Sequence, residues 1–308
     1  MGEMTTDEMT GGEMTLLITG ASGFVGRAAV RAARARGHAV VALYRSTLPD
    51  DCAGDAGITP LRLDLARDDA PDALRAALSG VDAVIHAAAH LGEDTQAIRD
   101  DTARGTAHLL QALEGHAARL VLVSSIAVYD TSALAPGATV TEDAPKVDPG
   151  NARDPYSASK AAQEAQVRAA RPDHWVMRPG AIYGPDRSWH ALLGFWASKL
   201  FVRIDGGGPL PLAHVDHVGQ ALVAAAETPV TGTVALNVID DDCPTRSRFV
   251  RVHRRLAGWP RLVLPMPYGL WLTLARALRP WQARLPGLLR EPVRRARLMP
   301  LDCPKDRL

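Results

Sequence analysis

The sequence has little cysteine, little lysine and no long apolar run. Its three cysteines, Cys52, Cys243 and Cys303, are widely spaced in 308 residues. This spacing excludes a disulfide-stabilised scaffold and offers no CxxC or Cys/His cluster for zinc. Sparse cysteine is typical of a reducing compartment, so we expect a cytoplasmic protein. The longest uncharged apolar stretch, residues 262–275, contains two prolines and is too short to span a bilayer.

Charge is unevenly distributed along the chain, although the net charge is only +1. Residues 245–308 carry 15 Arg or Lys and 3 Asp or Glu, a net charge of +12, whereas the remainder carries 20 basic and 31 acidic residues. We infer that residues 245–308 and the rest of the chain bind different partners, or bind each other. The apolar content of 47% and charged content of 22% exclude a wholly disordered, collagenous or coiled-coil chain.

Short apolar segments alternate with helical segments through the first 180 residues. The strand-like segments are 14–19, 39–44, 61–65, 81–87, 120–124 and 175–178, and the helical ones are 24–36, 71–79, 101–113 and 156–170. This alternation predicts parallel βαβ units, and hence an α/β fold with a Rossmann-type, doubly wound parallel sheet. The alternation weakens after Pro179 and returns as a helix and a strand over 213–240.

A glycine-rich turn, Gly20-Ala-Ser-Gly23-Phe-Val-Gly26, follows the first strand and opens the first helix. Glycines at such a turn let the backbone approach a pyrophosphate, while the helix N-terminus supplies amide groups and a positive dipole. The spacing is GxxGxxG rather than GxGxxG. Its position between a strand and a helix nevertheless predicts a dinucleotide site.

The second strand ends at Leu43-Tyr44-Arg45-Ser46, without an acidic residue. Dinucleotide folds place an acidic side chain here for the ribose hydroxyls of NAD, or an arginine for the 2′-phosphate of NADP. Arg45 therefore favours NADP, the other interpretation being a solvated arginine in an Arg-rich chain. Asp64-Leu65 follows the third strand, where it is placed to meet the adenine edge.

Tyr156-Ser-Ala-Ser-Lys160 puts a phenol and an ammonium on one face of a predicted helix, because residues i and i+4 are neighbours there. A nearby positive charge favours the phenolate and lowers the phenol pKa from near 10. Such a pair can exchange a proton with a carbonyl or alcohol oxygen. Ser124-Ser125 ends the strand before that helix, where a hydroxyl can donate a hydrogen bond to a reacting oxygen.

With these features the chain resembles an extended short-chain dehydrogenase/reductase of the NAD-dependent epimerase/dehydratase-like superfamily. The motifs that carry the resemblance are GASGFVG (20–26), DL (64–65), VIHAAA (84–89), GTAHLL (105–110), VSSIAVY (123–129), YSASK (156–160), RPGAIYGP (178–185) and HVDHV (214–218). The form RPGAIYGP, in which Gly180-Ala181 stands where nucleotide-sugar epimerases and dehydratases usually show Asn, is more similar to the hydroxysteroid-dehydrogenase-like reductase branch.

The resemblance implies site residues. Ser125, Tyr156 and Lys160 would be the catalytic set, with Tyr156 exchanging the proton and Lys160 binding the nicotinamide ribose. The expected cofactor-binding residues are Gly20, Ser22, Gly23, Phe24, Val25, Gly26, Arg45, Asp64, Leu65, Ala87, Ala88, Ala89, Ser124, Tyr156, Lys160, Pro179, Gly180 and Ile182. No metal ligand is expected, and His86 is interpreted as a structural, hydrogen-bonded histidine. Thr102 stands where the family usually has Asn, and Val215-Asp216-His217 replaces the usual VDD.

The resemblance also implies a division of the chain. We predict a disordered leader over 1–13, an NAD(P)-binding Rossmann domain over 14–184 to which 213–240 returns, and a smaller, mostly helical substrate-binding lobe over 185–212 and 241–308.

Two functions are compatible with this pattern. The first is an NADP-dependent oxidoreductase that transfers hydride between nicotinamide and a carbonyl or secondary alcohol. The alternative is a nucleotide-sugar epimerase or dehydratase with tightly bound NAD. A sensor that binds NADP(H) without catalysis has no need of the Ser125, Tyr156 and Lys160 set.

The expected partners are small molecules. The substrate is apolar or anionic, because the C-terminal lobe mixes Leu and Trp with arginine. That lobe is either a lid over an apolar pocket or a surface for peripheral membrane contact. Nucleic-acid binding is not expected, because no nucleic-acid module is present. The resemblance also implies a homodimer formed through two Ala-rich helices, near 101–113 and 156–170.

Overall fold

The computed structural model describes residues 12–48, 52–89, 96, 98, 100–281, 298–299 and 301–304. Most of the predicted leader lies outside these residues. The chain clusters into two compact units. The first unit comprises residues 1–123, 166–176 and 218–234, and the second comprises residues 124–165, 177–217 and 235–308.

A seven-stranded parallel sheet in the order β11-β6-β5-β4-β1-β2-β3 confirms the predicted fold class. Its strands are β1 (Thr15–Thr19), β2 (Ala39–Tyr44), β3 (Ile58–Arg62), β4 (Ala83–His86), β5 (Arg119–Val123), β6 (His174–Pro179) and β11 (Thr233–Val238). The order reverses at β1, which pairs with β2 on one side and with β4 on the other. In open α/β sheets, ligands bind beside such a reversal, at the carboxyl ends of the strands.

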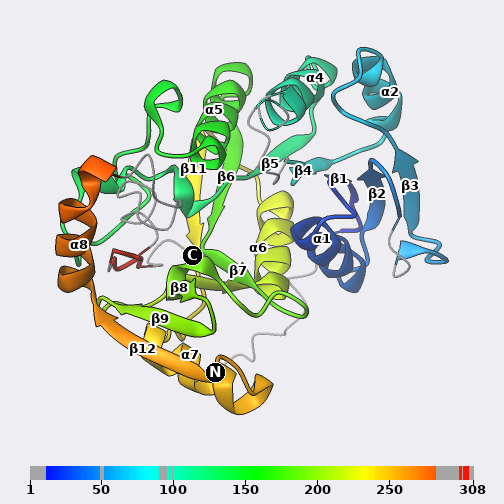
Figure 1. Cartoon of the computed structure of the whole chain (residues 1–308). Coiled ribbons are helices and arrows are strands. Elements are labelled where there is room, and N and C mark those ends of the chain that lie inside the picture. The colour runs from blue at the N-terminus through cyan, green and yellow to red at the C-terminus, as the bar shows by residue number, and fades with distance from the viewer. Residues whose placement is uncertain are drawn as a thin grey trace, which may run out of the picture. The chain divides into compact units, whose positions relative to one another are not determined.

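The helices between these strands follow the predicted pattern closely (Figure 1). They are α1 (Phe24–Ala35), α2 (Ala70–Ala77), α4 (Gly105–Ala112), α5 (Pro155–Ala170) and α6 (Val215–Glu227). A π-helical turn over Asp100–Arg104 precedes α4, so the helix predicted from residue 101 is only partly regular. Gly219 of α6 meets α1 so closely that a β-carbon there would lie 2.6 Å from the carbonyl oxygen of Ala28.

The third strand differs from the prediction, because β3 begins at Ile58 and ends at Arg62 rather than spanning 61–65. It is an edge strand, so Pro60 is tolerated in it although proline lacks an N–H. The strand ends because Asp64 starts a turn, in which its Oδ1 accepts a hydrogen bond of 3.0 Å from the N–H of Ala66. The alternating leucines at 61, 63 and 65 suggested a strand that this turn interrupts.

One apolar cluster fills the space between the sheet and the helices of the first unit. Fully buried leucines of several elements form its centre: Leu17, Leu74, Leu78, Leu109, Leu113, Leu120 and Leu122. Leu65, three residues beyond the end of β3, also belongs to this cluster. This packing fixes the positions of β1, β2 and β4, and hence of their carboxyl ends.

The second unit contains more strand than the sequence predicted. A three-stranded sheet of order β12-β9-β8 joins β8 (Gly194–Ala197), β9 (Leu200–Asp205) and β12 (Leu262–Pro267), while β7 (Ala181–Tyr183) pairs with β10 (Leu212–His214). Two helices, α7 (Arg246–Ala257) and α8 (Tyr268–Ala277), accompany this sheet. In Figure 1, β12 runs from α7 to α8.

Candidate functional site

The glycine turn after β1 has the tight geometry that its residues predict. Gly20 has a φ of 68°, in the left-handed region that glycine adopts without strain. A β-carbon on Gly20 would lie 2.9 Å from the backbone of Ala88, and one on Gly26 would lie 2.1 Å from the carbonyl oxygen of Gly20. Both positions therefore need glycine for close backbone packing.

This turn fits the pyrophosphate of a dinucleotide. Helix α1 starts at Phe24 after Gly23, which offers no side-chain cap, and no acidic residue occupies its first turn. First-turn amide groups and the helix dipole favour an anion at such an end. Ser22, Phe24 and Val25 lie in or directly after this turn. A dinucleotide held there would supply the hydride acceptor or donor.

A hydrogen-bonded chain fixes the end of β4 beside the glycine turn. The N–H of Ala88 donates to Thr19 Oγ1 (3.1 Å), and Thr19 Oγ1 lies 2.8 Å from His86 Nδ1. On its other side, His86 Nε2 lies 3.0 Å from Thr106 Oγ1, which donates to the carbonyl of Thr102 at 2.7 Å. His86 is thus a structural residue, as predicted, and it holds Ala87–Ala89 in place.

Two arginines lie where β2 and β3 end. Arg45 Nη1 is 2.8 Å from Asp101 Oδ2, and the Arg45 side chain is 57% exposed. Arg62 is opposite Tyr44 in the parallel register, and its Nε lies 3.5 Å from the Arg45 carbonyl oxygen. The sequence analysis missed Arg62, because only strand register brings it beside Arg45. A phosphate group there would compete with Asp101 for Arg45.

The Asp64-Leu65 pair has structural contacts of its own. Besides the turn that Asp64 forms, the carbonyl oxygen of Leu65 lies 2.8 Å from His108 Nδ1. The Leu65 side chain is buried, and Gly105 packs against its β-carbon. The backbone after β3 is therefore held firmly at the position predicted for the adenine edge.

In the second unit, Ser125 lies near the phenol of Tyr156. Burial raises the pKa of Tyr156, where the sequence predicted a lowered pKa, and the neighbouring Ser125 hydroxyl opposes that rise. Helix α5 begins at Pro155, and the carboxylate of Asp154 accepts from the N–H of Ser157 at 2.8 Å. This is the expected helix start, with an aspartate cap and proline in the first turn.

Arg153 holds the Ser125 loop against the start of α5. Its guanidinium donates to the carbonyls of Ala127 (2.5 Å) and Tyr129 (2.9 Å), which follow Ser125. The hydroxyl of Ser125 also accepts from the N–H of Ala127 at 3.2 Å. Arg153 is a positioning residue that sequence analysis missed, since nothing in the local pattern distinguishes it from other arginines.

Lys160 is buried one helical turn after Tyr156. Burial lowers the pKa of Lys160 to about 8, against the opposing effect of the Glu164 carboxylate. Its Nζ donates to Gln163 Oε1 at 3.0 Å. Tyr156, Lys160 and Glu164 are spaced four residues apart, so the three share one face of α5. That spacing was visible in the sequence and would have identified Glu164.

Glu164 forms a buried ion pair with Arg178 at the end of β6. Arg178 Nε and Nη2 donate to the two carboxylate oxygens at 2.9 and 2.8 Å, and the side chains are 1% and 4% exposed. The pair holds the pKa of Glu164 below its ordinary value in spite of burial. Glu164 Oε1 also accepts from Ser124 Oγ at 2.5 Å. The strand end that carries Ser124 and Ser125 is thereby fixed to the Lys160 helix.

Arg178 continues this network to the Ser125 loop. Its Nη1 donates to Tyr129 Oη (3.1 Å) and to the carbonyl of Glu142 (2.9 Å), and Tyr129 Oη donates to Asn237 Oδ1 at 2.6 Å. Every polar group in this chain of contacts has a partner, as buried groups require.

The segment Pro179–Ile182 crosses from β6 into β7. Gly180 donates to the carbonyl of Val238 at 3.0 Å, and a β-carbon on Gly180 would lie 2.3 Å from the carbonyl oxygen of Pro211. No side chain fits at this position, so the packing of this segment requires glycine. Ile182 is half-buried and pairs with Ala213 of β10.

The structure thus gathers the predicted residues into two groups, one in each compact unit. The glycine turn, Arg45, Asp64 and Ala87–Ala89 belong to the first, and Ser124, Ser125, Tyr156, Lys160 and Pro179–Ile182 belong to the second. Within the described residues, no cluster of His, Cys, Asp or Glu could hold a metal ion, and no helix is long and apolar enough to cross a membrane.

The chain matches the model of the NAD dependent epimerase/dehydratase family over residues 16–238. The match covers more than half of the chain, so the protein belongs to this family, and it is an NAD(P)-dependent oxidoreductase of the extended short-chain type.

Two curated relatives are reductases. The chain is 33% identical to the 3-diazoavenalumate denitrifying reductase of a Streptomyces species, over 87% of this chain and 88% of the relative. It is 32% identical to the ceramide reductase of Caulobacter vibrioides, over 81% of this chain and 73% of the relative. Among solved structures, MoeE5 in complex with UDP-glucose and NAD is similar with a TM-score of 0.64. That match covers 84% of this chain and 86% of MoeE5 at 23% identity, and it supports the fold.

Proposed function

We propose that the protein is an NADP-dependent reductase that transfers hydride between nicotinamide and a carbonyl or secondary alcohol. The observation that carries the proposal is the position of Tyr156 one helical turn before the buried Lys160, with Ser125 near enough to lower the pKa of Tyr156. A hydroxyl beside a phenol can form a proton-donating pair for an oxygen atom that changes charge. The curated reductases support this direction of reaction.

In this proposal each residue of the set has a separate task. Ser125 donates a hydrogen bond to the substrate oxygen, and Tyr156 delivers the proton. Burial raises the pKa of Tyr156, so the phenol is protonated at neutral pH and acts as the acid in carbonyl reduction. The charged Lys160 binds ribose hydroxyls and favours the phenolate that remains after proton transfer. The glycine turn 20–26 binds the pyrophosphate.

The charge of Lys160 gives turnover a testable pH dependence. Because its pKa is about 8, we expect turnover to fall as the pH rises through 8, where the ammonium loses its proton. Gln163→Met removes an oxygen that accepts from the ammonium, so the pKa of Lys160 should fall and the alkaline limb should move to lower pH. Gln166→Met, on the same helix, should leave the limb in place. If turnover of Gln163→Met falls at the same alkaline pH as turnover of the parent, this role of Lys160 is contradicted.

Arg45 and Arg62 support the choice of NADP. Two guanidinium groups at neighbouring strand ends suit a doubly charged 2′-phosphate better than an uncharged ribose. NAD-bound solved structures such as MoeE5 are less than 25% identical to this chain and do not weigh on this choice.

The first experiment is a titration of the protein with NADPH and with NADH, with mass spectrometry of any nucleotide released on denaturation. We expect NADPH to bind more tightly. Arg45→Ser should weaken NADPH binding about tenfold, as the loss of a charge-assisted bond implies, and leave NADH binding unchanged. Arg67→Ser, an exposed arginine paired with Asp69, is the control. Stoichiometric release of NAD would contradict the proposal.

The alternative is a nucleotide-sugar epimerase or dehydratase with tightly bound NAD. The basic character of residues 245–281 favours it, since a nucleotide diphosphate is anionic. Gly180-Ala181 counts against it, because nucleotide-sugar epimerases and dehydratases usually show Asn in this segment and neither residue can replace that side chain. A thermal shift with UDP-sugars, together with released NAD, would favour the alternative. NADPH consumption with a panel of ketones would favour the reductase.

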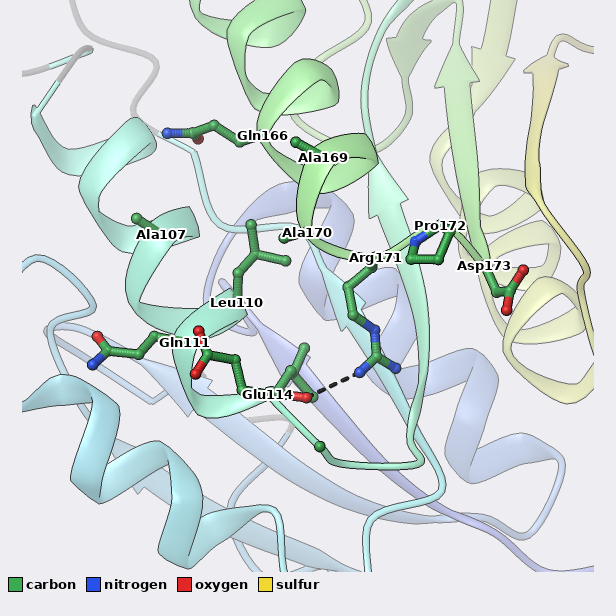
Figure 2. A pocket seen from close by; sticks show the side chains of 12 residues that line it. Ala107, Leu110, Gln111, Glu114, Gln166, Ala169, Ala170, Arg171, Pro172 and Asp173 are labelled. Carbon is green, nitrogen blue, oxygen red and sulfur yellow. Dashed lines mark hydrogen bonds between the residues drawn. The ribbon is translucent and has the colours of Figure 1, made fainter.

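We also propose the division into a Rossmann domain and a substrate-binding lobe that the sequence predicts, and a homodimer formed through α4 and α5. A groove of about 750 Å³ lies between α4 and the second half of α5 (Figure 2). Small and polar side chains line it, among them Ala107, Gln111, Ala169 and Ala170. None of the predicted cofactor-binding or catalytic residues lines this groove. The groove is therefore a candidate contact for a helix of a second copy rather than a substrate pocket.

A further inference from the structure

The turn that precedes α4 has an unusual backbone and is held firmly. Residues Asp100–Arg104 form a π-helical turn, a rare conformation that is frequently found at functional sites. Thr102 is 3% exposed, and its carbonyl oxygen accepts from Thr106 Oγ1 at 2.7 Å. Thr106 Oγ1 also lies 3.0 Å from His86 Nε2, in the chain of contacts that fixes the end of β4. Asp101 belongs to this turn, so its backbone is held in place.

Asp101 reaches from this turn to the end of β2. Its Oδ2 accepts from Arg45 Nη1 at 2.8 Å, and the side chains of Asp101 and Arg45 are 31% and 57% exposed. An ion pair that is this exposed contributes little free energy, because water and salt screen both charges. The pair therefore opens readily when a stronger anion binds. Arg45 is the same guanidinium that would bind the 2′-phosphate of NADP in the proposed function.

A carboxylate and a phosphate compete for one guanidinium, since both fit the same fork of N–H donors. The 2′-phosphate carries more negative charge than Asp101, so it would displace the carboxylate from Arg45. Its binding then has two costs. The Arg45–Asp101 pair must open, and the released Asp101 carboxylate stays close to a group of like charge that is bound to the same arginine. An uncharged ribose imposes neither cost, because it leaves the pair closed.

We propose that Asp101 is a positioning residue that lowers the affinity for NADP by competing for Arg45. This role rests on the proposed function, because it requires Arg45 to bind the 2′-phosphate. A reductase must exchange its dinucleotide in every turnover, and product release limits the rate of many enzymes. When the Asp101 carboxylate returns to Arg45, it promotes the departure of NADP⁺. The chain thus selects the 2′-phosphate through Arg45 without holding the oxidised dinucleotide for long.

The test is isothermal titration calorimetry of the full chain with NADPH and with NADH. Asp101→Asn should tighten NADPH binding about fivefold, the equilibrium effect of removing one exposed ion pair, and leave NADH binding unchanged. Adenosine 2′,5′-bisphosphate, which lacks the nicotinamide half, should respond as NADPH does. The gain should shrink as salt rises. Stopped-flow displacement should show slower dissociation of NADP⁺ from the variant, because related complexes differ mostly in their dissociation rates.

Further variants separate competition for Arg45 from a structural role of the turn. In the Arg45→Ser background, Asp101→Asn should lose most of its effect on NADPH binding. Asp101→Glu keeps the charge and should keep an affinity close to that of the parent. Asp68→Asn is the matched control, because it removes one negative charge and the ion pair that Asp68 forms with Arg104 of the same turn. It should leave NADPH binding unchanged.

The thermal melt of each variant is measured alongside its affinities. The role of Asp101 is overturned if Asp101→Asn leaves NADPH binding unchanged, if Asp68→Asn gives the same gain, or if the full gain persists in Arg45→Ser. Weaker NADH binding in Asp101→Asn would assign the carboxylate to ribose hydroxyls and overturn the role as well. A parent that binds NADH as tightly as NADPH would remove both the proposed function and this role. An NADPH preference without a gain in Asp101→Asn would remove this role alone.

Discussion

Tyr156→Phe should reduce turnover by a factor of about 10² to 10⁴, the usual contribution of a positioned proton donor. The variant removes one oxygen atom, which lies near Ser125 at the start of a helix that Asp154 caps independently. NADPH affinity and the thermal melt should therefore change little. The loss would appear in kcat, because the proton is transferred only in the chemical step.

Tyr183→Phe is the control for this variant. Tyr183 also has a raised pKa, of about 12, because of burial and of the neighbouring Asp240 carboxylate. Its phenol has no role in the proposed proton transfer, so turnover should remain close to that of the parent. Near-normal turnover in Tyr156→Phe would overturn the mechanism, and equal loss in both variants would indicate a general disturbance of the site.

Arg178→Met should destabilise the protein by about 3–5 kcal/mol, because it leaves the buried Glu164 carboxylate without its partner. The loss should be largest near neutral pH. The pKa of Glu164 is lowered in the folded state by Arg178, so the stabilisation exists above the ordinary pKa of a glutamate. It is lost as the pH falls through the folded value. Urea unfolding at several pH values measures both effects.

Two further variants distinguish the ion pair from simple packing. Glu164→Leu combined with Arg178→Met removes both charges and should recover part of the stability, since an apolar replacement of a buried pair is often neutral. Arg67→Met removes one member of the exposed Arg67–Asp69 pair and should leave the unfolding midpoint unchanged. A double variant that is no more stable than Arg178→Met would show that the bonds to Tyr129 and Glu142 carry the effect.

The fold and the principal motifs could be predicted because they depend on short-range patterns. Alternating apolar strands and helices specify the parallel sheet, and the Tyr156–Lys160 spacing follows from one helical turn. The three-stranded sheet β12-β9-β8 was not predicted. Leu262 pairs with Leu200 across about sixty intervening residues. All three strands are short, β12 contains two prolines, and β8 contains glycine and tryptophan.

The site residues that the sequence did not identify depend on tertiary contacts, which leave no local pattern. Arg62 lies beside Arg45 only through strand register, and Arg178 meets Glu164 only after β6 and α5 pack together. Arg153 acts through backbone carbonyls, which have no sequence signature. Glu164 is the exception, because its place four residues after Lys160 was available from the sequence.

The strand β11, at the edge of the main sheet beside β6, is the last of the seven to appear in the chain. Between β6 and β11 the chain runs through the segment 180–232, which includes β7, β8, β9, β10 and α6. During synthesis, the first six strands emerge from the ribosome well before residue 238. The nascent protein must therefore keep β6 as an unpaired edge for several seconds at ordinary elongation rates of about 5–20 residues per second. Truncation between β6 and β11 leaves that edge open to strand pairing with other chains.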